Sequence, residues 1–196
     1  MDAFLTGGAR FIQLRAKHAP SGELLSLAQL VVERARKAGA VVIVNDRADI
    51  AKLSGADGVH VGQHDLEPAL VRRVLGGAAV VGLSTHTIDQ VRQASRLAVD
   101  YIAVGPIFGS SSKETGYSAV GTALVSQARA QLAEAGLSTP IVAIGGITLE
   151  TAPAVLQAGA SAVAVIADLL STGDPQTRIR EYRACRRGRE TDLSSN

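Results

Sequence analysis

The stretch AVVIVN, residues 40–45, decides the fold. It is a short run of aliphatic, mostly β-branched residues that is apolar on both faces, and such runs are typical of strands inside a parallel sheet. The preceding residues 21–39, SGELLSLAQLVVERARKAG, carry apolar residues at helical spacing, with Ser21 as a candidate N-cap and Gly39 as a candidate C-terminal stop. Together the two segments predict a helix that leads into a buried strand.

The same alternation of patterns continues along the chain in both directions. Counting residues 40–45, the sequence predicts seven strands, and the other six lie at residues 10–15, 57–62, 79–84, 100–105, 140–145 and 161–166. Further helices are predicted at residues 67–75, 88–97, 123–135, 149–158 and 175–186. Buried strands that alternate with helices predict a parallel sheet covered by helices.

Two architectures contain such a sheet, the open doubly wound fold and the closed (β/α)8 or TIM barrel. No G-x-G-x-x-G motif follows the first predicted strand, which argues against the open fold. Polar side chains follow nearly every predicted strand, and a ring of polar groups at the C-terminal ends of strands is typical of a barrel. We therefore predict a TIM barrel domain over residues 1–186, followed by a polar, disordered tail over residues 187–196.

The strand count is one short of a closed barrel, which has eight strands. The opening residues 1–8, MDAFLTGG, have the pattern of the last turns of a helix that ends at glycine. We therefore expect the first strand of the barrel to be absent from this chain. The strands at residues 10–15 and 161–166 would then be exposed edges, which favour pairing with other chains, so a partner at this seam or a homo-oligomer is an alternative to an isolated, active monomer.

Composition argues against several classes of protein. Aromatic residues make up only 3% of the 196 residues and the net charge is +2, so neither a stacking surface for nucleic acid nor a strong field toward a membrane is expected. The single cysteine, Cys185, excludes an internal disulfide framework and a thiolate metal cluster. No apolar run reaches about 18 residues and no secretory signal is recognisable, so we expect a cytoplasmic protein.

Two carboxylates follow neighbouring predicted strands. Asp46 lies in NDR after one strand, and Asp65 lies in GQHD after the next. Neighbouring strand ends lie close together in a parallel barrel, and carboxylate oxygens suit Mg²⁺, so the pair predicts a magnesium site. The alternative is that Asp46 caps the following turn and Asp65 caps the helix that begins near residue 67.

Basic and amide side chains accompany these carboxylates. Gln13, Arg15 and Lys17 alternate in RFIQLRAKH, residues 10–18, so in an extended chain they share one face. Arginine suits bidentate phosphate contact and lysine a point-charge contact, and cations beside a carboxylate-held metal indicate a pyrophosphate site. Lys113 is a further candidate, although a solvated charge on a loop is the alternative for it.

Three loop segments are candidates for phosphate binding. Residues 105–121, GPIFGSSSKETGYSAVG, form a long loop without helical period, in which Ser110 and Ser112 could donate to a phosphate. The pair Gly145–Gly146 follows one late strand and Ile166–Ala167 closes the last, and barrels often bind phosphate between these two loops. The alternative for the long loop is a plain flexible connection.

The remaining polar residues receive less specific interpretations. His60 alternates with valines and points inward, so we interpret it as a core histidine bonded to a neighbour, whereas His86 stands at a strand end and could orient a ligand. The arginines near the C-terminus are interpreted as a solvated helix face and tail: Arg178, Arg180, Arg183, Arg186, Arg187 and Arg189. A nucleic-acid partner is not favoured.

The motifs QLRAK, NDRADIA, GADGVHVGQHDL, STH, DYIAVGPIF, SSSK and PIVAIGGI closely resemble those of the thiamine-phosphate synthase family, in matching order from about Ala3 to the final helix. The resemblance implies a transferase of thiamine biosynthesis. It would join a pyrimidine carrying a diphosphate to a thiazole carrying a monophosphate and release pyrophosphate, through a pyrimidine cation formed before the thiazole attacks.

The resemblance also assigns roles to residues. Gln13, Arg15, Lys17, Asn45 and Lys113 would contact the pyrimidine diphosphate, Ser84 would contact the pyrimidine substrate, and Asp46 and Asp65 would bind Mg²⁺. Arg15, Lys17, Ser84 and Lys113 would carry the catalysis. The thiazole phosphate would be held by Ser110, Ser112, Gly146, Ile166 and Ala167.

Two departures from the family pattern stand out. Ala167 replaces a serine usual in the family after the last strand, so one phosphate contact would be left to the backbone, and the first strand of the family is missing. Two rival functions follow. A thiazole tautomerase of the related barrel family would not need the diphosphate residues, and a non-catalytic binder of phosphorylated metabolites would not turn over substrate.

Overall fold

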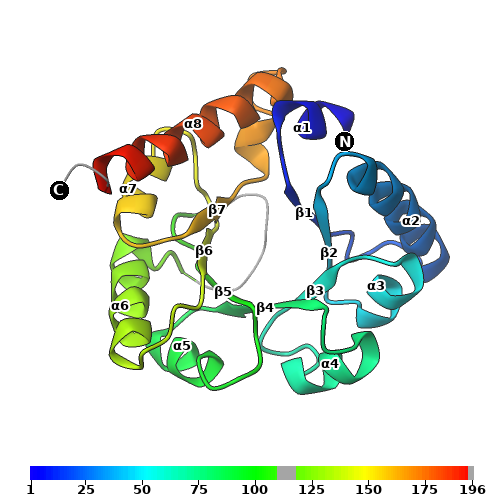
Figure 1. Ribbon diagram of the computed structural model, residues 1–196, viewed down its shortest axis with the longest axis horizontal. Helices are drawn as coiled ribbons and strands as arrows, with labels where there is room; N and C mark the ends of the chain where they lie inside the picture. The colour runs from blue at the N-terminus through cyan, green and yellow to red at the C-terminus, as the bar shows by residue number, and fades with distance from the viewer. Residues whose placement is uncertain (110–117, 194–196) are drawn as a thin grey trace.

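A computed structural model describes residues 1–109 and 118–193, with side chains described as far as Cys185. These residues form a curled sheet of seven parallel strands in sequence order, with helices around its outside (Figure 1). The seven predicted strands are confirmed. They are β1 (Phe11–Leu14), β2 (Val41–Asn45), β3 (Gly58–Val61), β4 (Val80–Thr85), β5 (Tyr101–Val104), β6 (Ile141–Ile144) and β7 (Ala162–Ala164).

Helices follow the strands in regular alternation and form the outer layer of the molecule (Figure 1). The α-helices are α1 (Asp2–Gly7), α2 (Ser21–Lys37), α3 (Ala48–Ser54), α4 (Pro68–Leu75), α5 (Ile88–Ala94), α6 (Gly121–Glu134), α7 (Ala152–Gln157) and α8 (Pro175–Leu193). A short 3₁₀ helix, η1 (Ala167–Leu169), follows β7. As predicted, α1 ends at a glycine, Gly8, in the left-handed conformation with φ 100°.

The predicted end of the last helix was wrong. The helix was expected over residues 175–186, and α8 extends to Leu193. Polarity alone does not end a helix, and the arginines and glutamate of this segment have good helix propensity. The boundary drawn between residues 186 and 187 therefore does not coincide with a helix end.

The sheet curls far enough to bring its distant strands into contact. The rings of Phe11 in β1 and Tyr101 in β5 meet edge to face, with their centroids 5.7 Å apart. In the part of the chain that the structure describes, β1 and β7 are the two ends of the strand order and do not pair with each other. On the outside, α1 packs against α8, where a Cβ on Gly7 would lie 2.7 Å from the Gln176 carbonyl oxygen. The architecture is thus a curled barrel-like sheet, open between β1 and β7.

The main core lies between the sheet and the surrounding helices. Its largest fully buried side chains include Ile102, Ile141, Leu132 and Val91. On β6, Ile141 and Ala143 are fully buried toward the helices, whereas Val142 and Ile144 on the opposite face are only half-buried. On this strand the inner face is therefore more accessible than the outer one. The described part of the chain has no helix of the length and apolarity that crossing a membrane requires.

Acceptor side chains stabilise the N-terminal ends of three strands. Asp57 precedes β3 and accepts a hydrogen bond at 2.7 Å from the backbone N–H of Val42. Asp100 precedes β5 and accepts at 2.7 Å from the N–H of Val81, and Arg72 donates to the same oxygen at 2.9 Å. Ser161 precedes β7 and its hydroxyl accepts at 3.3 Å from the N–H of Ile141. At this end of the sheet, two carboxylates and a hydroxyl complete the hydrogen bonding of neighbouring strands.

Candidate active site

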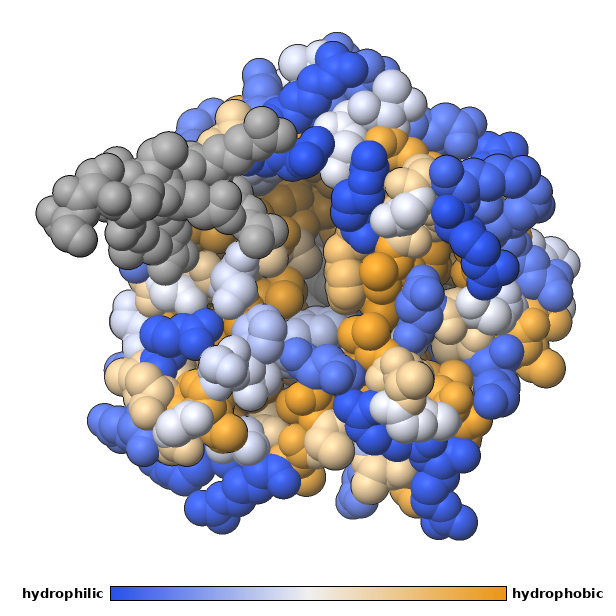
Figure 2. All heavy atoms as spheres, in the orientation of Figure 1, coloured by the Kyte–Doolittle hydropathy of each residue, from blue (hydrophilic) through white to orange (hydrophobic). Residues whose placement is uncertain are grey.

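Polar side chains of several strands share the inner face of the sheet. Register pairs Gln13 with Ile43, Asn45 with His60, His60 with Gly82, and Ser84 with Ala103. Residues paired in register point to the same face, and residues two apart on a strand do so as well. Gln13, Asn45, His60 and Ser84 therefore all face the inside of the curled sheet. Figure 2 shows hydrophobic residues gathered toward the middle of this view, which is hollowed, and mainly hydrophilic residues around its rim.

Asp46 occupies a strained position directly after β2. Its φ is 64°, and it is the one non-glycine residue with a positive φ among the residues that the structure describes. Its N–H donates to the carbonyl oxygen of His60 at 2.8 Å, which joins the ends of β2 and β3. Such strain in a residue other than glycine typically marks functional sites, where the surrounding structure imposes it.

The carboxylate of Asp46 is held between a cation and a second carboxylate. Lys17 Nζ lies 3.1 Å from Asp46 Oδ2, and both residues line a pocket together with Asn45 and Arg47. Burial raises the pKa of Asp46, Lys17 lowers it, and Asp65 raises it through hydrogen bonding and charge. The net direction is upward, so the half-buried carboxylate carries an electrostatic cost that a bound cation would relieve.

The capping alternatives for the two aspartates are wrong. Asp65 Oδ2 accepts from the Gly62 N–H at 2.7 Å, and the N-cap of α4 is Glu67, without a side-chain cap bond. The N-cap of α3 is Arg47, likewise without a side-chain cap bond. Asp65 instead lies close enough to Asp46 to raise the pKa of the Asp46 carboxyl.

The chemistry of this pair fits Mg²⁺. Both donors are carboxylates, and Mg²⁺ is usually held by one or two carboxylates, completing its shell with water and substrate phosphates. Among the described residues, no group of three or more histidine, cysteine, aspartate or glutamate side chains is placed to hold a metal ion. The site therefore fits a cation that shares its ligands with a substrate better than an ion fully enclosed by protein.

A chain of hydrogen bonds crosses the inner face from Ser84. His60 Nε2 lies 2.7 Å from Ser84 Oγ, and His60 Nδ1 lies 2.9 Å from the Tyr101 hydroxyl. His60 is buried, which confirms the interpretation of a core histidine bonded to neighbours. Tyr101 reaches it across β4 because Gly82 leaves room, since a Cβ there would lie 2.0 Å from the tyrosine ring. Burial raises the pKa of Tyr101, so its hydroxyl stays protonated.

The loop after β6 has a backbone that only glycine adopts easily. Gly145 and Gly146 have φ values of 92° and 65°. A Cβ on Gly146 would lie 2.5 Å from the carbonyl oxygen of Gly109, so this loop packs directly on the loop after β5. After β7, Ile166 and Ala167 are exposed. The structure therefore leaves both predicted phosphate-binding loops accessible.

The predicted residues fall into three groups. Lys17, Asn45 and Asp46 line one pocket, and Asp65 acts on Asp46 from the end of β3. Gln13 and Ser84 lie on the inner face, and Arg15 is half-buried in the turn after β1. Ser110, Ser112 and Lys113 lie outside the described residues. The roles assigned to all of them stay predictions.

Sequence reasoning assigned no role to Tyr101, which bonds His60 on the inner face. Gln63, one of the polar residues after β3, donates from its Nε2 to the Ser84 carbonyl oxygen at 2.6 Å. Tyr101 had a signal, because it is one of few aromatic residues and opens an otherwise aliphatic strand. His86 was expected to orient a ligand. In the structure its Nδ1 makes a short hydrogen bond to the carbonyl oxygen of Gly105, so the ring is held by the protein itself. Burial lowers the pKa of His86, which favours the neutral ring.

The chain is similar in sequence to known proteins of one family. The profile of the family described as thiamine monophosphate synthase matches residues 1–169. The chain is 42% identical over 180 residues to a thiamine-phosphate synthase of Chlorobium luteolum, covering 92% of this chain and 82% of the relative. It is 41% identical over 181 residues to the corresponding protein of Roseiflexus castenholzii, covering 92% of this chain and 77% of the relative.

A solved structure gives the same result at the level of the fold. The thiamine phosphate pyrophosphorylase of Pyrococcus furiosus superposes with a TM-score of 0.84 at 27% sequence identity, covering 95% of this chain and 87% of that one. Profile, sequence and fold thus agree over nearly the whole chain. The chain belongs to the thiamine monophosphate synthase family.

Proposed function

We propose that this chain joins a pyrimidine diphosphate to a thiazole phosphate in a Mg²⁺-dependent reaction that forms thiamine phosphate and releases pyrophosphate. Its relatives are named for this transferase activity, and the residues of the chain supply what the chemistry needs. The single observation that carries the metal and the mechanism is the strained position of Asp46 beside both Asp65 and Lys17.

The two aspartates would hold Mg²⁺ and leave part of its shell to the leaving diphosphate. Bound Mg²⁺ would neutralise charge that develops on the diphosphate oxygens. Two carboxylates balance the charge of one divalent cation, and the raised pKa of Asp46 reflects a site that is unfavourable until a cation arrives. Lys17, paired with Asp46 at 3.1 Å, lies where it can turn to the diphosphate when the metal takes its place.

The basic residues after β1 would bind and stabilise the departing diphosphate. Arg15 suits bidentate contact with phosphate oxygens, and Lys17 adds a point charge. Gln13 and Asn45 face the same interior and can donate amide hydrogens to the substrate. Lys113 is a further candidate from the long loop. The protein thus stabilises the leaving group electrostatically rather than through a covalent nucleophile.

The bond between the pyrimidine methylene carbon and the diphosphate oxygen would break first, and its electron pair would leave with the diphosphate. The resulting pyrimidine cation would be captured by the lone pair of the thiazole nitrogen, which forms the new carbon–nitrogen bond. Ser84, fixed by His60 at 2.7 Å, would position the pyrimidine, while backbone groups near Gly146 and Ala167 would hold the thiazole phosphate. Orientation of the two substrates supplies much of the rate enhancement.

One assay separates this function from its rivals. The chain is incubated with both substrates and Mg²⁺, and the amounts of pyrophosphate and thiamine phosphate are measured. We expect the two products to form in equal amounts. Controls omit the thiazole phosphate or replace Mg²⁺ by a chelator, and both are expected to stop the reaction. Isomerisation of the thiazole precursor without pyrophosphate would indicate a tautomerase instead. Binding of both substrates without any product would indicate a non-catalytic binder.

A further inference from the structure

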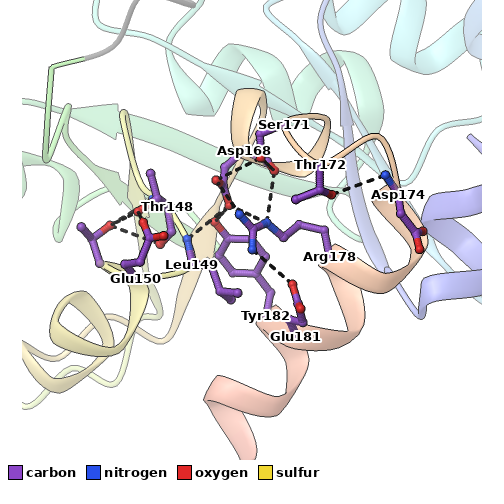
Figure 3. A network of polar contacts seen from close by, with 11 residues as sticks. Thr148, Leu149, Glu150, Asp168, Ser171, Thr172, Asp174, Arg178, Glu181 and Tyr182 are labelled. Atoms are coloured by element: carbon purple, nitrogen blue, oxygen red, sulfur yellow. Dashed lines mark hydrogen bonds and ion pairs between the residues drawn. The ribbon is translucent and has the colours of Figure 1, made fainter.

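A partly buried polar cluster lies beside the proposed thiazole-phosphate loops and outside the residues assigned so far. Its centre is Asp168 in η1, one residue after Ala167. Tyr182 donates its hydroxyl hydrogen to Asp168 Oδ2 at 2.6 Å, and the backbone N–H of Leu149 donates to the same oxygen at 3.2 Å (Figure 3). Arg178 Nε lies 3.1 Å from this oxygen. One carboxylate therefore collects donors from two other parts of the chain, the loop after β6 and α8.

The ion pair at the centre of this cluster is shielded from solvent. The side chains of Arg178 and Asp168 are 14% and 11% exposed, so interpreting Arg178 as part of a solvated helix face was wrong. The guanidinium also donates from a second nitrogen to Asp168 Oδ1 at 3.2 Å, which gives the pair a two-pronged geometry. A shielded ion pair contributes little net stability against its desolvation cost, so its presence calls for a further role.

Asp168 joins three segments of the chain, and two of them belong to the proposed phosphate-binding loops. Leu149 belongs to the loop after β6 that begins with Gly145 and Gly146, and Asp168 itself follows the exposed turn at Ile166 and Ala167. The third segment is α8, which supplies the arginine and the tyrosine from outside the sheet. Asp168 therefore ties the two proposed phosphate-binding loops to each other and to α8.

The charges of the cluster suit an anion in front of it. A bare carboxylate next to the phosphate loops would repel a phosphate, and the Arg178 guanidinium cancels this charge at 3.1 Å. Burial and the hydrogen bond to Asp168 raise the pKa of Tyr182, so its hydroxyl remains a donor at neutral pH. The cluster thus gives the loops a fixed geometry in which Arg178 offsets the charge of Asp168, while another nitrogen of the same guanidinium pairs at 3.2 Å with the more exposed Glu181.

We propose that Asp168 is a positioning residue for the thiazole phosphate, which holds the loop after β6 and the turn after β7 at the separation that phosphate binding requires. The choice of thiazole phosphate as the ligand rests on the proposed function. Asp168 does not touch the reacting atoms, so its loss would weaken binding of the phosphate carried by the thiazole and leave binding of the pyrimidine diphosphate almost unchanged.

The test compares Asp168→Ala with Asp100→Asn, a change at a matched carboxylate. Asp100 also accepts from a backbone N–H and from an arginine, but it lies at the opposite ends of the strands. Binding of thiazole phosphate alone is measured by calorimetry, and KM for each substrate is measured by pyrophosphate release. For Asp168→Ala we expect Kd and KM for thiazole phosphate to rise about tenfold or more, with KM for the pyrimidine diphosphate within about twofold.

Milder variants keep the test informative if Asp168→Ala fails to fold. Asp168→Asn keeps an acceptor oxygen for the Leu149 N–H, and Tyr182→Phe removes one hydrogen bond, so both are expected to raise the same Kd by smaller factors. Unchanged thiazole-phosphate binding in folded variants would overturn the inference. An equal loss in Asp100→Asn, or a parallel rise of KM for both substrates, would also overturn it by showing a general loosening of the fold.

The calorimetric measurement also separates this inference from the proposed function. A wild-type chain that binds thiazole phosphate but releases no pyrophosphate would contradict the proposed function, and the Kd of the variants would still decide the role of Asp168. A wild-type chain that does not bind thiazole phosphate at all would overturn the assignment of these loops.

Discussion

The two ends of the sheet use the same residue type in opposite ways. At the N-terminal ends of the strands, Asp57 and Asp100 each accept a backbone N–H of the neighbouring strand at 2.7 Å. At the C-terminal ends, Asp46 is strained, half-buried and close to Asp65, and the surroundings raise its pKa. Asp57 and Asp100 complete the hydrogen bonding of the fold, whereas Asp46 keeps a charge in an unfavourable place.

This difference shows how one barrel separates stability from chemistry. A carboxylate that receives hydrogen bonds is favourable in its charged form, and a carboxylate beside another carboxylate is not. Natural proteins retain such unfavourable groups where a ligand repays the cost, which is the usual trade between stability and activity at functional sites. Substitutions at the N-terminal ends of the strands should therefore lower the stability of the protein with little effect on its activity. Substitutions at the C-terminal ends should lower the activity with little loss of stability.

The largest expected effect is at Asp46. We expect Asp46→Ala to lower kcat about a thousandfold or more, because it removes a ligand of the metal that neutralises the leaving group. Turnover is measured by pyrophosphate release at saturating substrates and Mg²⁺, and circular dichroism checks that the variant is folded. Turnover close to the wild-type value would remove Asp46 from the mechanism.

The second effect is at Gly58, at the start of β3. A Cβ at this position would lie 1.9 Å from the carbonyl oxygen of Val80 in the neighbouring strand, so the two backbones would have to separate. We expect Gly58→Ala to lower the free energy of unfolding by about 3 kcal/mol. Urea denaturation measures this loss, and the fraction that remains folded should keep a kcat close to the wild-type value. A loss of kcat in the folded fraction would contradict the proposal that the N-terminal ends of the strands serve stability and the C-terminal ends serve catalysis.

A smaller effect is expected at Asp100. Asp100→Asn weakens the bonds to Val81 and Arg72, and because the carboxylate is partly exposed we expect a loss of about 1 kcal/mol in the free energy of unfolding. The kcat/KM values for both substrates should stay within about twofold of the wild type, since the change lies far from the site. Equilibrium denaturation and steady-state kinetics on one preparation measure both quantities. A stable but inactive Asp100→Asn variant would contradict the proposal that this end of the sheet serves stability rather than catalysis.

The smallest effect concerns the pH dependence of stability. Burial and Asp65 raise the pKa of Asp46 above its ordinary value of 3.8, so its favourable contribution is fully present below pH 3.8 and is lost as the pH rises through the folded-state pKa. In the presence of a chelator, Asp46→Asn should therefore gain stability relative to the wild type as the pH rises through the folded-state pKa of Asp46. Urea midpoints measured between acid and neutral pH test this, and a difference between the two proteins that stays constant with pH would show that Asp46 titrates normally.

Much of the fold could be predicted because local sequence patterns indicate most of its strands and helices. All seven strands were found from short aliphatic runs, and the glycine end of α1 was found from its last residues. The end of α8 was missed because a polar sequence is compatible with both helix and disorder. Arg178 was misplaced for a related reason, since one side of a helix is solvated only if nothing packs against it.

The candidate site was predicted in part. Asp46, Asp65 and Lys17 were expected near one another because parallel strands end at the same rim, and the structure brings them together. The bond between His60 and Tyr101 was not expected in detail, because it crosses a whole strand and depends on the space left by Gly82. A sequence pattern does not show which small residue of one strand lies beneath a ring from the neighbouring strand.

By itself, the sequence determined the alternation of strands and helices, the kind of sheet they build and the rim on which polar groups gather. These features follow from periods of two and 3.6 residues, which are local properties of the backbone. Only the tertiary structure decided that Asp46 is strained beside Lys17 and that Asp168 joins two loops to α8. Such contacts join residues far apart in the chain, and their geometry depends on the register and curl of the whole sheet.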